Sequence, residues 1–259
     1  MEFIRFILIG IVQGLTEFLP VSSSGHLVIF NYFLNINLPG VFFELLLHVG
    51  TVLSIFVLFY KRIISILKSV LSWKKDEDFF TGMYIIMANI PTAIIGFGFK
   101  GFFESLFSIN FVLFSLFING LIIASAAFIK ESNQKLTPFK SVFIGIAQGI
   151  AIIPGISRSG STILAALVSK IPARKAFEFS FLMSLPAICG AALLEFLKVK
   201  NEFVFNTGIF VGFIFSFLSG LLALLMLKKT VEKKKLHYFG IYCIILSVIL
   251  FIFRRTVNV

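Results

Sequence analysis

The sequence contains few cysteines and few acidic residues, and each scarcity narrows the class of protein. Cys189 and Cys243 are the two cysteines among 259 residues, and both lie in apolar stretches, so neither a disulfide framework nor a metal cluster is indicated. Twelve acidic residues face 23 basic ones, for a formal net charge of +11. Because the lysines stand between apolar segments, we attribute this charge to membrane topology and expect no nucleic-acid partner.

Apolar residues are abundant instead. They make up 58% of the chain, with 35 phenylalanines, against about 45 to 50% in soluble domains. The N-terminus lacks the small-residue cleavage site of a signal peptide, so we expect it to remain on the mature chain. Six apolar segments reach the roughly 20 residues that a spanning helix needs. They lie at about 41–60, 79–99, 107–129, 176–197, 205–227 and 236–253. The sequence therefore predicts an all-α integral membrane protein with six transmembrane helices.

One polar pattern occurs twice, 135 positions apart. Gly10-Ile-Val-Gln-Gly14 leads to Ser22-Ser-Ser-Gly25, and Gly145-Ile-Ala-Gln-Gly149 leads to Ser157-Arg-Ser-Gly160. Pro20 and Pro154 stand in the two breaks, and the leg after each break is too short to cross a bilayer alone. Because irregular backbone at membrane depth needs protein or water around it, we interpret both stretches as re-entrant helical hairpins that face a common interior.

The arrangement of the two halves follows from counting crossings and charges. Residues 1–135 and 136–259 each hold one hairpin and three crossings, which predicts two inverted repeats within one structural domain. If each hairpin returns to the side it entered, one face carries 16 of the 23 Lys and Arg residues and the other carries six. The richer face is predicted to be cytoplasmic, with both termini outside. Lys140 to Pro154 spans about 21 Å of helix, so the breaks should meet near the membrane centre.

The chemistry of the breaks favours an anion. A short helix begins after each break, and its free N–H groups and positive dipole end suit a phosphate. Arg158 adds a planar fork for bidentate phosphate binding, which fits a diphosphate better than a carboxylate. Taken alone, serines before a helix are usually caps and glycines usually allow close packing. The predicted substrate-binding residues are Gln13, Ser22, Ser24, Gly155, Ser157, Ser159 and Thr162.

Catalysis is indicated by Glu17, Ser23 and His26, which bring an acid, a hydroxyl and a proton-transfer group into one break. We favour Ser23 as nucleophile with His26 as its base, while a phospho-enzyme on His26 assisted by Glu17 remains open. Arg158 completes the predicted catalytic set. Glu44 and His48, four residues apart on one helix face, could line the cavity or form a buried pair that orients the hairpins, and we leave His48 outside the site.

Residues 13–26 (QGLTEFLPVSSSGH) and 154–162 (PGISRSGST) resemble the two signature motifs of bacterial undecaprenyl-diphosphate phosphatases of the bacitracin-resistance type. The resemblance implies a plasma-membrane hydrolase that converts C55 isoprenyl diphosphate to the monophosphate and inorganic phosphate. It further implies recycling of the lipid carrier for peptidoglycan synthesis, and activity supported by Mg²⁺ or Ca²⁺. Gln13 stands where many members have glutamate, so Glu17 and the substrate phosphates would hold the cation.

An alternative is a transporter or flippase of an anionic lipid phosphate, because inverted repeats with broken helices are a common carrier architecture. A carrier needs the anion-binding breaks but not the Glu17, Ser23 and His26 grouping, which favours an enzyme. The sequence leaves open the nucleophile, the preferred metal, the prenyl chain length and the oligomeric state, a homo-oligomer included.

Overall fold

The described residues form a bundle of helices around six long apolar ones. A computed structural model of the chain describes residues 2–34, 41–130, 132–199 and 207–257, and within these ranges it contains helices and no strand. Six helices in the described ranges are long and apolar enough to span a membrane. They are α3 (Val41–Leu71), α4 (Glu77–Gly98), α6 (Ile109–Ala124, extended by η1, Ser125–Phe128), α9 (Ala173–Val199), α10 (Thr207–Glu232) and α11 (His237–Val257). The predicted all-α membrane fold is confirmed.

Two of these helices end five or more residues later than the sequence predicts. The α3 helix continues eleven residues past position 60 to Leu71, and α10 continues past 227 to Glu232. Charged residues mark the end of a membrane segment, but they do not end a helix, because Lys and Arg are good helix formers. Positions 205 and 206 of the fifth predicted segment lie outside the described residues.

The two repeated stretches form four shorter helices. They are α1 (Glu2–Phe18), α2 (Ser23–Leu34), α7 (Pro138–Ile150) and α8 (Arg158–Val168), with 17, 12, 13 and 11 residues. Each is shorter than the roughly 20 residues needed to cross a bilayer. Their entry and exit on one side of the membrane, and the division into repeats 1–135 and 136–259, stay predictions.

The first hairpin helix of each half of the chain packs against a long helix of the other half. The α1 helix lies along α10, α7 lies along α4, and α6 lies along α11. Glycine permits the two close contacts: a Cβ on Gly10 would collide with the Gly212 carbonyl, and one on Gly145 with the Ala88 carbonyl. Since Gly10 and Gly145 are 135 positions apart, equivalent legs make equivalent contacts, and neither half is packed without the other.

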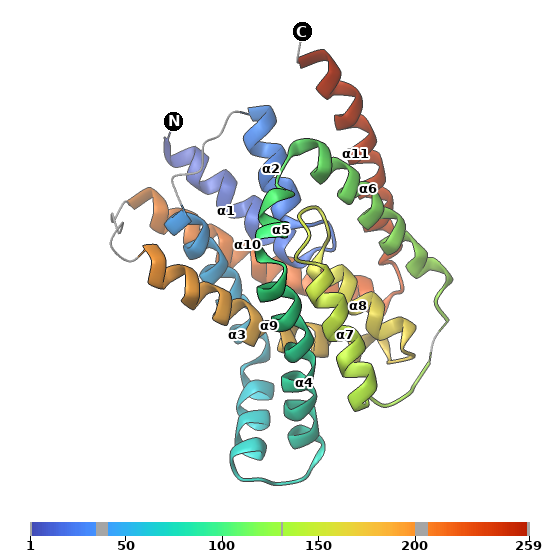
Figure 1. The fold of residues 1–259 in the computed structure, drawn as a ribbon. Coiled ribbons are helices and arrows are strands. Elements are labelled where there is room, and N and C mark those ends of the chain that lie inside the picture. Colours follow the sequence, from blue (N-terminus) through green and yellow to red (C-terminus); the bar gives the residue numbers. More distant parts are fainter. Residues whose placement is uncertain (1, 35–40, 131, 200–206, 258–259) are drawn as a thin grey trace.

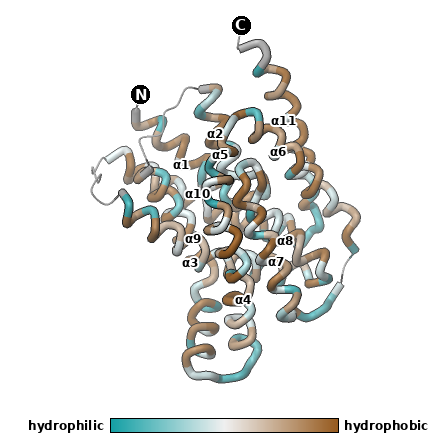
Figure 2. The backbone as a smooth tube through the Cα atoms, in the orientation of Figure 1, coloured by the Kyte–Doolittle hydropathy of each residue, from teal (hydrophilic) through white to brown (hydrophobic). Residues whose placement is uncertain are grey.

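Both described ends of the chain lie at the same end of the molecule. In Figure 1 the start of α1 and the end of α11 lie at the top, while α3 and α4 project as a hairpin at the bottom. The helices are mostly brown in Figure 2, and the loop that joins α3 to α4 is teal. In that loop Asp76 caps α4 by accepting the Phe79 amide at 2.9 Å, a hydrogen bond that lowers the pKa of its carboxyl.

An ion-pair cluster ties this projecting hairpin to the bundle. The Arg62 guanidinium on α3 donates to Glu178 on α9 at 2.6 Å and to Asp78 on α4. Glu178 is therefore the partner of a basic residue near the end of α3 and not a group of the central site.

Aromatic side chains fill the core beneath the first break. Phe18, at the end of α1, is fully buried and packs edge-on against Phe181 of α9 at 5.5 Å between ring centroids. Phe177 packs on the same Phe181 ring at 4.8 Å. Because Phe18 directly follows Glu17, this packing fixes the position of the Glu17 backbone at the end of α1.

Candidate active site

The two helix breaks lie in direct contact, as the sequence predicts. A Cβ added at Gly160 would lie 2.9 Å from the Pro20 Cβ, and one added at Gly25 would lie 3.2 Å from the Gly155 Cα. Gly155 has a φ of +95°, a backbone conformation that L side chains rarely adopt. The second break can therefore approach the first only with small residues at these positions.

Both breaks start their second helix with the same serine cap. Ser22 Oγ accepts the Gly25 amide at 3.2 Å, and Ser157 Oγ accepts the Gly160 amide at 3.2 Å. Each capping serine also contacts the hydroxyl two residues later, in Ser24 at 3.3 Å and in Ser159 at 3.2 Å. Capping, the structural role that the sequence left open for these serines, is thus present in both copies.

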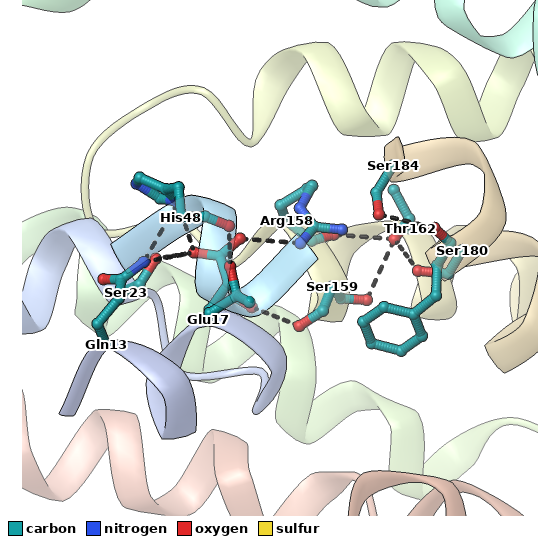
Figure 3. A network of polar contacts seen from close by, with 12 residues as sticks. Gln13, Glu17, Ser23, His48, Arg158, Ser159, Thr162, Ser180 and Ser184 are labelled. Carbon is teal, nitrogen blue, oxygen red and sulfur yellow. Dashed lines mark hydrogen bonds and ion pairs between the residues drawn. The ribbon is translucent and has the colours of Figure 1, made fainter. Parts of the chain in front are cut away.

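Glu17 is the centre of a network that joins the two breaks (Figure 3). Arg158 Nη2 donates to Glu17 Oε1 at 2.9 Å, and Ser23 Oγ donates to Glu17 Oε2 at 2.8 Å. Gln13 Nε2 donates to the same Oε2 at 3.2 Å. The side chains of Glu17 and Arg158 are 7% and 15% exposed, so the pair is largely removed from solvent. Two residues predicted for catalysis, Ser23 and Arg158, therefore both bond a third, Glu17.

His48 also reaches this network, although the sequence interpretation left it outside the site. Its Nδ1 lies 3.7 Å from Glu17 Oε2 and 3.3 Å from Gln13 Nε2, and its side chain is 39% exposed. The Glu44–His48 spacing did signal a polar face on α3, but spacing within one helix does not reveal that α3 packs beside α1. Within the described contacts, His48 is the histidine that touches the carboxylate.

His26 points elsewhere. Its Nδ1 lies 2.8 Å from the Ser22 carbonyl oxygen and its Nε2 lies 2.8 Å from the Tyr242 hydroxyl, with the two rings stacked. The pairing of Ser23 with His26 that the sequence favours does not occur among the described hydrogen bonds, where Ser23 donates to Glu17 instead. The ring turns back along its own helix start, a side-chain direction that the sequence does not encode. The catalytic role of His26 stays a prediction.

Further polar residues support the second break. Asn119 on α6 is fully buried; its Oδ1 accepts the Ser157 amide at 2.9 Å, and its Nδ2 donates to the Pro20 carbonyl at 3.4 Å. On the other side, the Thr162 hydroxyl lies 2.6 Å from the hydroxyl of Ser180 on α9. Sequence reasoning missed both partners. An amide within an apolar span was the available signal for Asn119, because such groups are costly in hydrocarbon unless paired.

Two buried atoms at the centre of this network have no hydrogen-bond partner within the described part of the chain. They are Gln13 Oε1 and Arg158 Nη1. Gln13 is fully buried, and its amide nitrogen must face Glu17 because a carboxylate only accepts. An unused guanidinium N–H suits a phosphate oxygen, and an unused amide oxygen beside a carboxylate suits a hard cation or a donor. The described residues contain no group of three or more His, Cys, Asp and Glu side chains that could hold a metal unaided.

These features define a multi-pass α-helical membrane protein with a carboxylate, a guanidinium and a hydroxyl held between two helix breaks. Comparison with known proteins gives the family. The chain belongs to the family of bacitracin resistance protein BacA, whose family model matches residues 6–249.

Proteins named undecaprenyl-diphosphatase are similar to this chain over nearly its whole length. The Thermosipho africanus protein is 41% identical over 251 residues, 95% of this chain and 98% of the relative. The Halothermothrix orenii protein is 39% identical over 97% of this chain and 98% of its own length. The Methanococcus vannielii protein is 43% identical over 93% and 96%.

Proposed function

We infer that this protein is an undecaprenyl-diphosphatase, a membrane hydrolase that converts C55 isoprenyl diphosphate to the monophosphate and inorganic phosphate. The observation that carries the proposal is the contact of Ser23, Glu17 and Arg158 across two helix breaks. The names of the full-length relatives support it. A carrier would use the breaks and the arginine, but it has no need of a hydroxyl hydrogen-bonded to a carboxylate.

Binding of the diphosphate is assigned to Arg158 and the starts of α2 and α8. Arg158 already uses Nη2 on Glu17, and its buried, unused Nη1 offers a further donor. The first amides of the two helices, with their positive dipole ends, add donors that do not depend on side-chain hydroxyls. Ser22 and Ser157 keep those helix starts in place as caps, and Ser24, Ser159 and Thr162 belong to the first five residues of the same two helices.

The reaction begins with Ser23. Its hydroxyl donates to Glu17, so Glu17 is placed to take the proton as Ser23 Oγ attacks the terminal phosphorus. The bond from that phosphorus to the bridging oxygen breaks, and the lipid monophosphate leaves with the electron pair. Water then attacks the phosphorus of the phosphoserine, and the bond from phosphorus to Ser23 Oγ breaks. Ser23 takes back the proton that Glu17 held, and inorganic phosphate leaves with both protons of the water. Glu17 thus replaces His26 as the preferred base, because both ring nitrogens of His26 are engaged elsewhere.

A divalent cation, Mg²⁺ or Ca²⁺, fits the oxygen donors at this place. Glu17 and the unused Gln13 Oε1 would hold it together with substrate phosphate oxygens, since such cations often bind through few protein ligands. It would neutralise charge on the diphosphate.

The proposed location is the cytoplasmic membrane, with both termini outside and the lysine-rich loops in the cytoplasm. The substrate partner is a polyprenyl diphosphate lipid. Its monophosphate product would return as the lipid carrier for cell-wall precursors, which accounts for resistance to bacitracin.

The test is phosphate release by purified protein in detergent from C55 isoprenyl diphosphate, with Mg²⁺, Ca²⁺ or EDTA. We expect release by the wild type and a loss of about 100-fold or more in Ser23→Ala and Glu17→Gln. Ser161→Ala, a half-buried hydroxyl on α8 outside the network, is the matched control and should keep wild-type release. Folded wild-type protein that binds the lipid but releases no phosphate under any metal condition would refute the hydrolase and favour the carrier.

A further inference from the structure

The first break contains a strained residue that its counterpart lacks. Ser22 has a φ of +70°, in the left-handed region that non-glycine residues rarely occupy. Its equivalent in the second copy, Ser157, has a φ of −84° and makes the same cap. Strain of this kind persists only where surrounding contacts hold it. The residue that follows Ser22 is Ser23, whose hydroxyl bonds Glu17, so the strained residue directly orients the proposed nucleophile.

His26 supplies the contact that holds Ser22. The Ser22 carbonyl accepts the His26 amide at 3.1 Å, as the Ser157 carbonyl accepts the Ser161 amide at 2.9 Å in the second copy. Among the hydrogen bonds of the described residues, the first copy alone adds a side chain, the imidazole Nδ1 of His26, at 2.8 Å from the same carbonyl oxygen. The imidazole is therefore the extra restraint at the one cap whose serine is left-handed.

Chemistry fixes the protons in this chain of contacts. A carbonyl oxygen only accepts, so Nδ1 carries the hydrogen in its bond to Ser22. In the neutral ring Nε2 is then an acceptor, and the Tyr242 hydroxyl at 2.8 Å must be its donor. Tyr242 belongs to α11, is 44% exposed, and stacks its ring on His26 at 5.8 Å between centroids. His26 itself is 5% exposed.

We propose that Tyr242 is a positioning residue that acts through His26: it selects the ring tautomer that holds the Ser22 carbonyl and thereby keeps Ser23 on Glu17. His26 is then a positioning residue as well, and not the base or the phosphorylated group. The proposal rests on the proposed function for its link to turnover. The arrangement of Tyr242, His26 and Ser22 itself can be measured without substrate.

Kinetics of four variants test the role of His26. Asparagine can keep an amide donor near the position of Nδ1 but cannot act as a base or accept a phosphate. We expect His26→Ala to lose about 100-fold in kcat, because small misplacements at a reacting centre have effects of that size, and His26→Asn to recover most of the loss. Tyr242→Phe should lower kcat about three- to tenfold with little change in KM, the effect of one lost hydrogen bond. Tyr238→Phe, an exposed tyrosine on the same helix, should match the wild type.

Nitrogen NMR of histidine-labelled protein in detergent gives the readout that does not require turnover. The wild type should show His26 as a single tautomer protonated on Nδ1, and Tyr242→Phe should show a mixture, while Tyr238→Phe should not. A folded His26→Asn protein as inactive as His26→Ala would overturn the proposal, as would a His26 signal that Tyr242→Phe leaves unchanged. If the wild type itself releases no phosphate, the proposed function fails, and the NMR result still decides whether Tyr242 sets the tautomer.

Discussion

The proposed site requires two tasks of Arg158 that only a guanidinium can combine. Its Nη2 pairs with Glu17 at 2.9 Å, and its Nη1 is buried with no hydrogen-bond partner among the described residues. A lysine would keep the charge, and so would not leave Glu17 as an unpaired buried anion, but it lacks the planar fork. Pairing with the carboxylate and binding a phosphate oxygen would then compete for one ammonium group.

We therefore expect Arg158→Lys to fold normally and to lose roughly 100-fold in kcat/KM for the lipid diphosphate, with much of the loss in KM. Steady-state phosphate release and a thermal melt in detergent measure the two quantities. Arg62→Lys, the same exchange in the ion-pair cluster of α3, α4 and α9, is the control and should stay within about threefold. An Arg158→Lys enzyme with wild-type kinetics would show that no bidentate contact is used.

In the proposed site, Gln13 is expected to influence how strongly a cation is bound. Its amide donates to Glu17, so a carboxylate in its place would exchange a hydrogen bond for like-charge repulsion that a divalent ion relieves. Because ligand charge tunes cation affinity, we expect Gln13→Glu to lower the half-saturating Mg²⁺ or Ca²⁺ concentration about tenfold and to reduce release further in EDTA. Metal titrations of phosphate release measure this. Gln148→Glu, the equivalent exchange in the second copy beside Thr92, is the control and should leave the half-saturating metal concentration unchanged. Equal changes of that concentration in both variants would count against a cation at Glu17.

At the residue scale, the sequence predicted that Glu17, Ser23 and Arg158 would gather, and the reason is local. Each stands within a few residues of a break, and both breaks had to face protein because hydrocarbon cannot satisfy open backbone. The histidines could not be assigned in the same way. The ring of His26 turns back to Ser22, and His48 reaches Glu17 from α3. The direction of a histidine ring and the identity of the neighbouring helix depend on tertiary packing, which the spacing of residues in the sequence does not predict.

At the element scale, α6 holds the two breaks against each other through Asn119. Its side chain takes the Ser157 amide and donates to the Pro20 carbonyl, so one residue satisfies backbone groups in both loops. An apolar side chain of similar size would leave the Ser157 N–H buried without a partner, which costs about 1 to 3 kcal/mol. The same change would loosen Arg158 relative to Glu17, because Arg158 directly follows Ser157.

Asn119→Leu is thus expected to lower the thermal midpoint by several degrees and to lower kcat more than KM. Fluorescence-detected melting in detergent and phosphate release are the measurements. Asn31→Leu, at an exposed position near the end of α2, is the matched control and should change neither. A stable Asn119→Leu protein with unaltered kcat would mean that the breaks are fixed by glycine packing alone.

Element boundaries were predictable where hydropathy sets them and not where packing does. The six apolar segments were found because a bilayer demands their length. The continuation of α3 to Leu71 was not, since the charged residues that end the apolar segment do not end the helix. The pairing of Arg62 there with Glu178 of α9 and Asp78 of α4 is also a tertiary contact. The packing of α1 on α10 and of α7 on α4, between the two halves, could not be predicted either. A glycine-lined helix face can pack against many different helices.

At the scale of the whole molecule, the remaining question is which side of the membrane each end occupies. The start of α1 and the end of α11 lie at one end of Figure 1, opposite the loop between α3 and α4. Sixteen of the 23 basic residues fall on the face that this loop belongs to in the predicted topology. From the bias of Lys and Arg toward the cytoplasm we predict that the loop lies inside and both termini lie outside.

Single cysteines introduced into a protein with Cys189 and Cys243 replaced by alanine give the measurement. Ser72→Cys, exposed in the loop between α3 and α4, should react with a membrane-impermeant maleimide in inside-out vesicles and not in intact cells. Ser105→Cys, exposed in α5 (Lys100–Ser105) between α4 and α6, should react in intact cells. Because α4 joins these two positions by a single crossing, they must lie on opposite sides, so each position is the control for the other. The reverse labelling pattern would show that the topology is the opposite of the predicted one. The α1–α2 break would then be entered from the cytoplasmic side, and the substrate would be hydrolysed in the cytoplasmic leaflet.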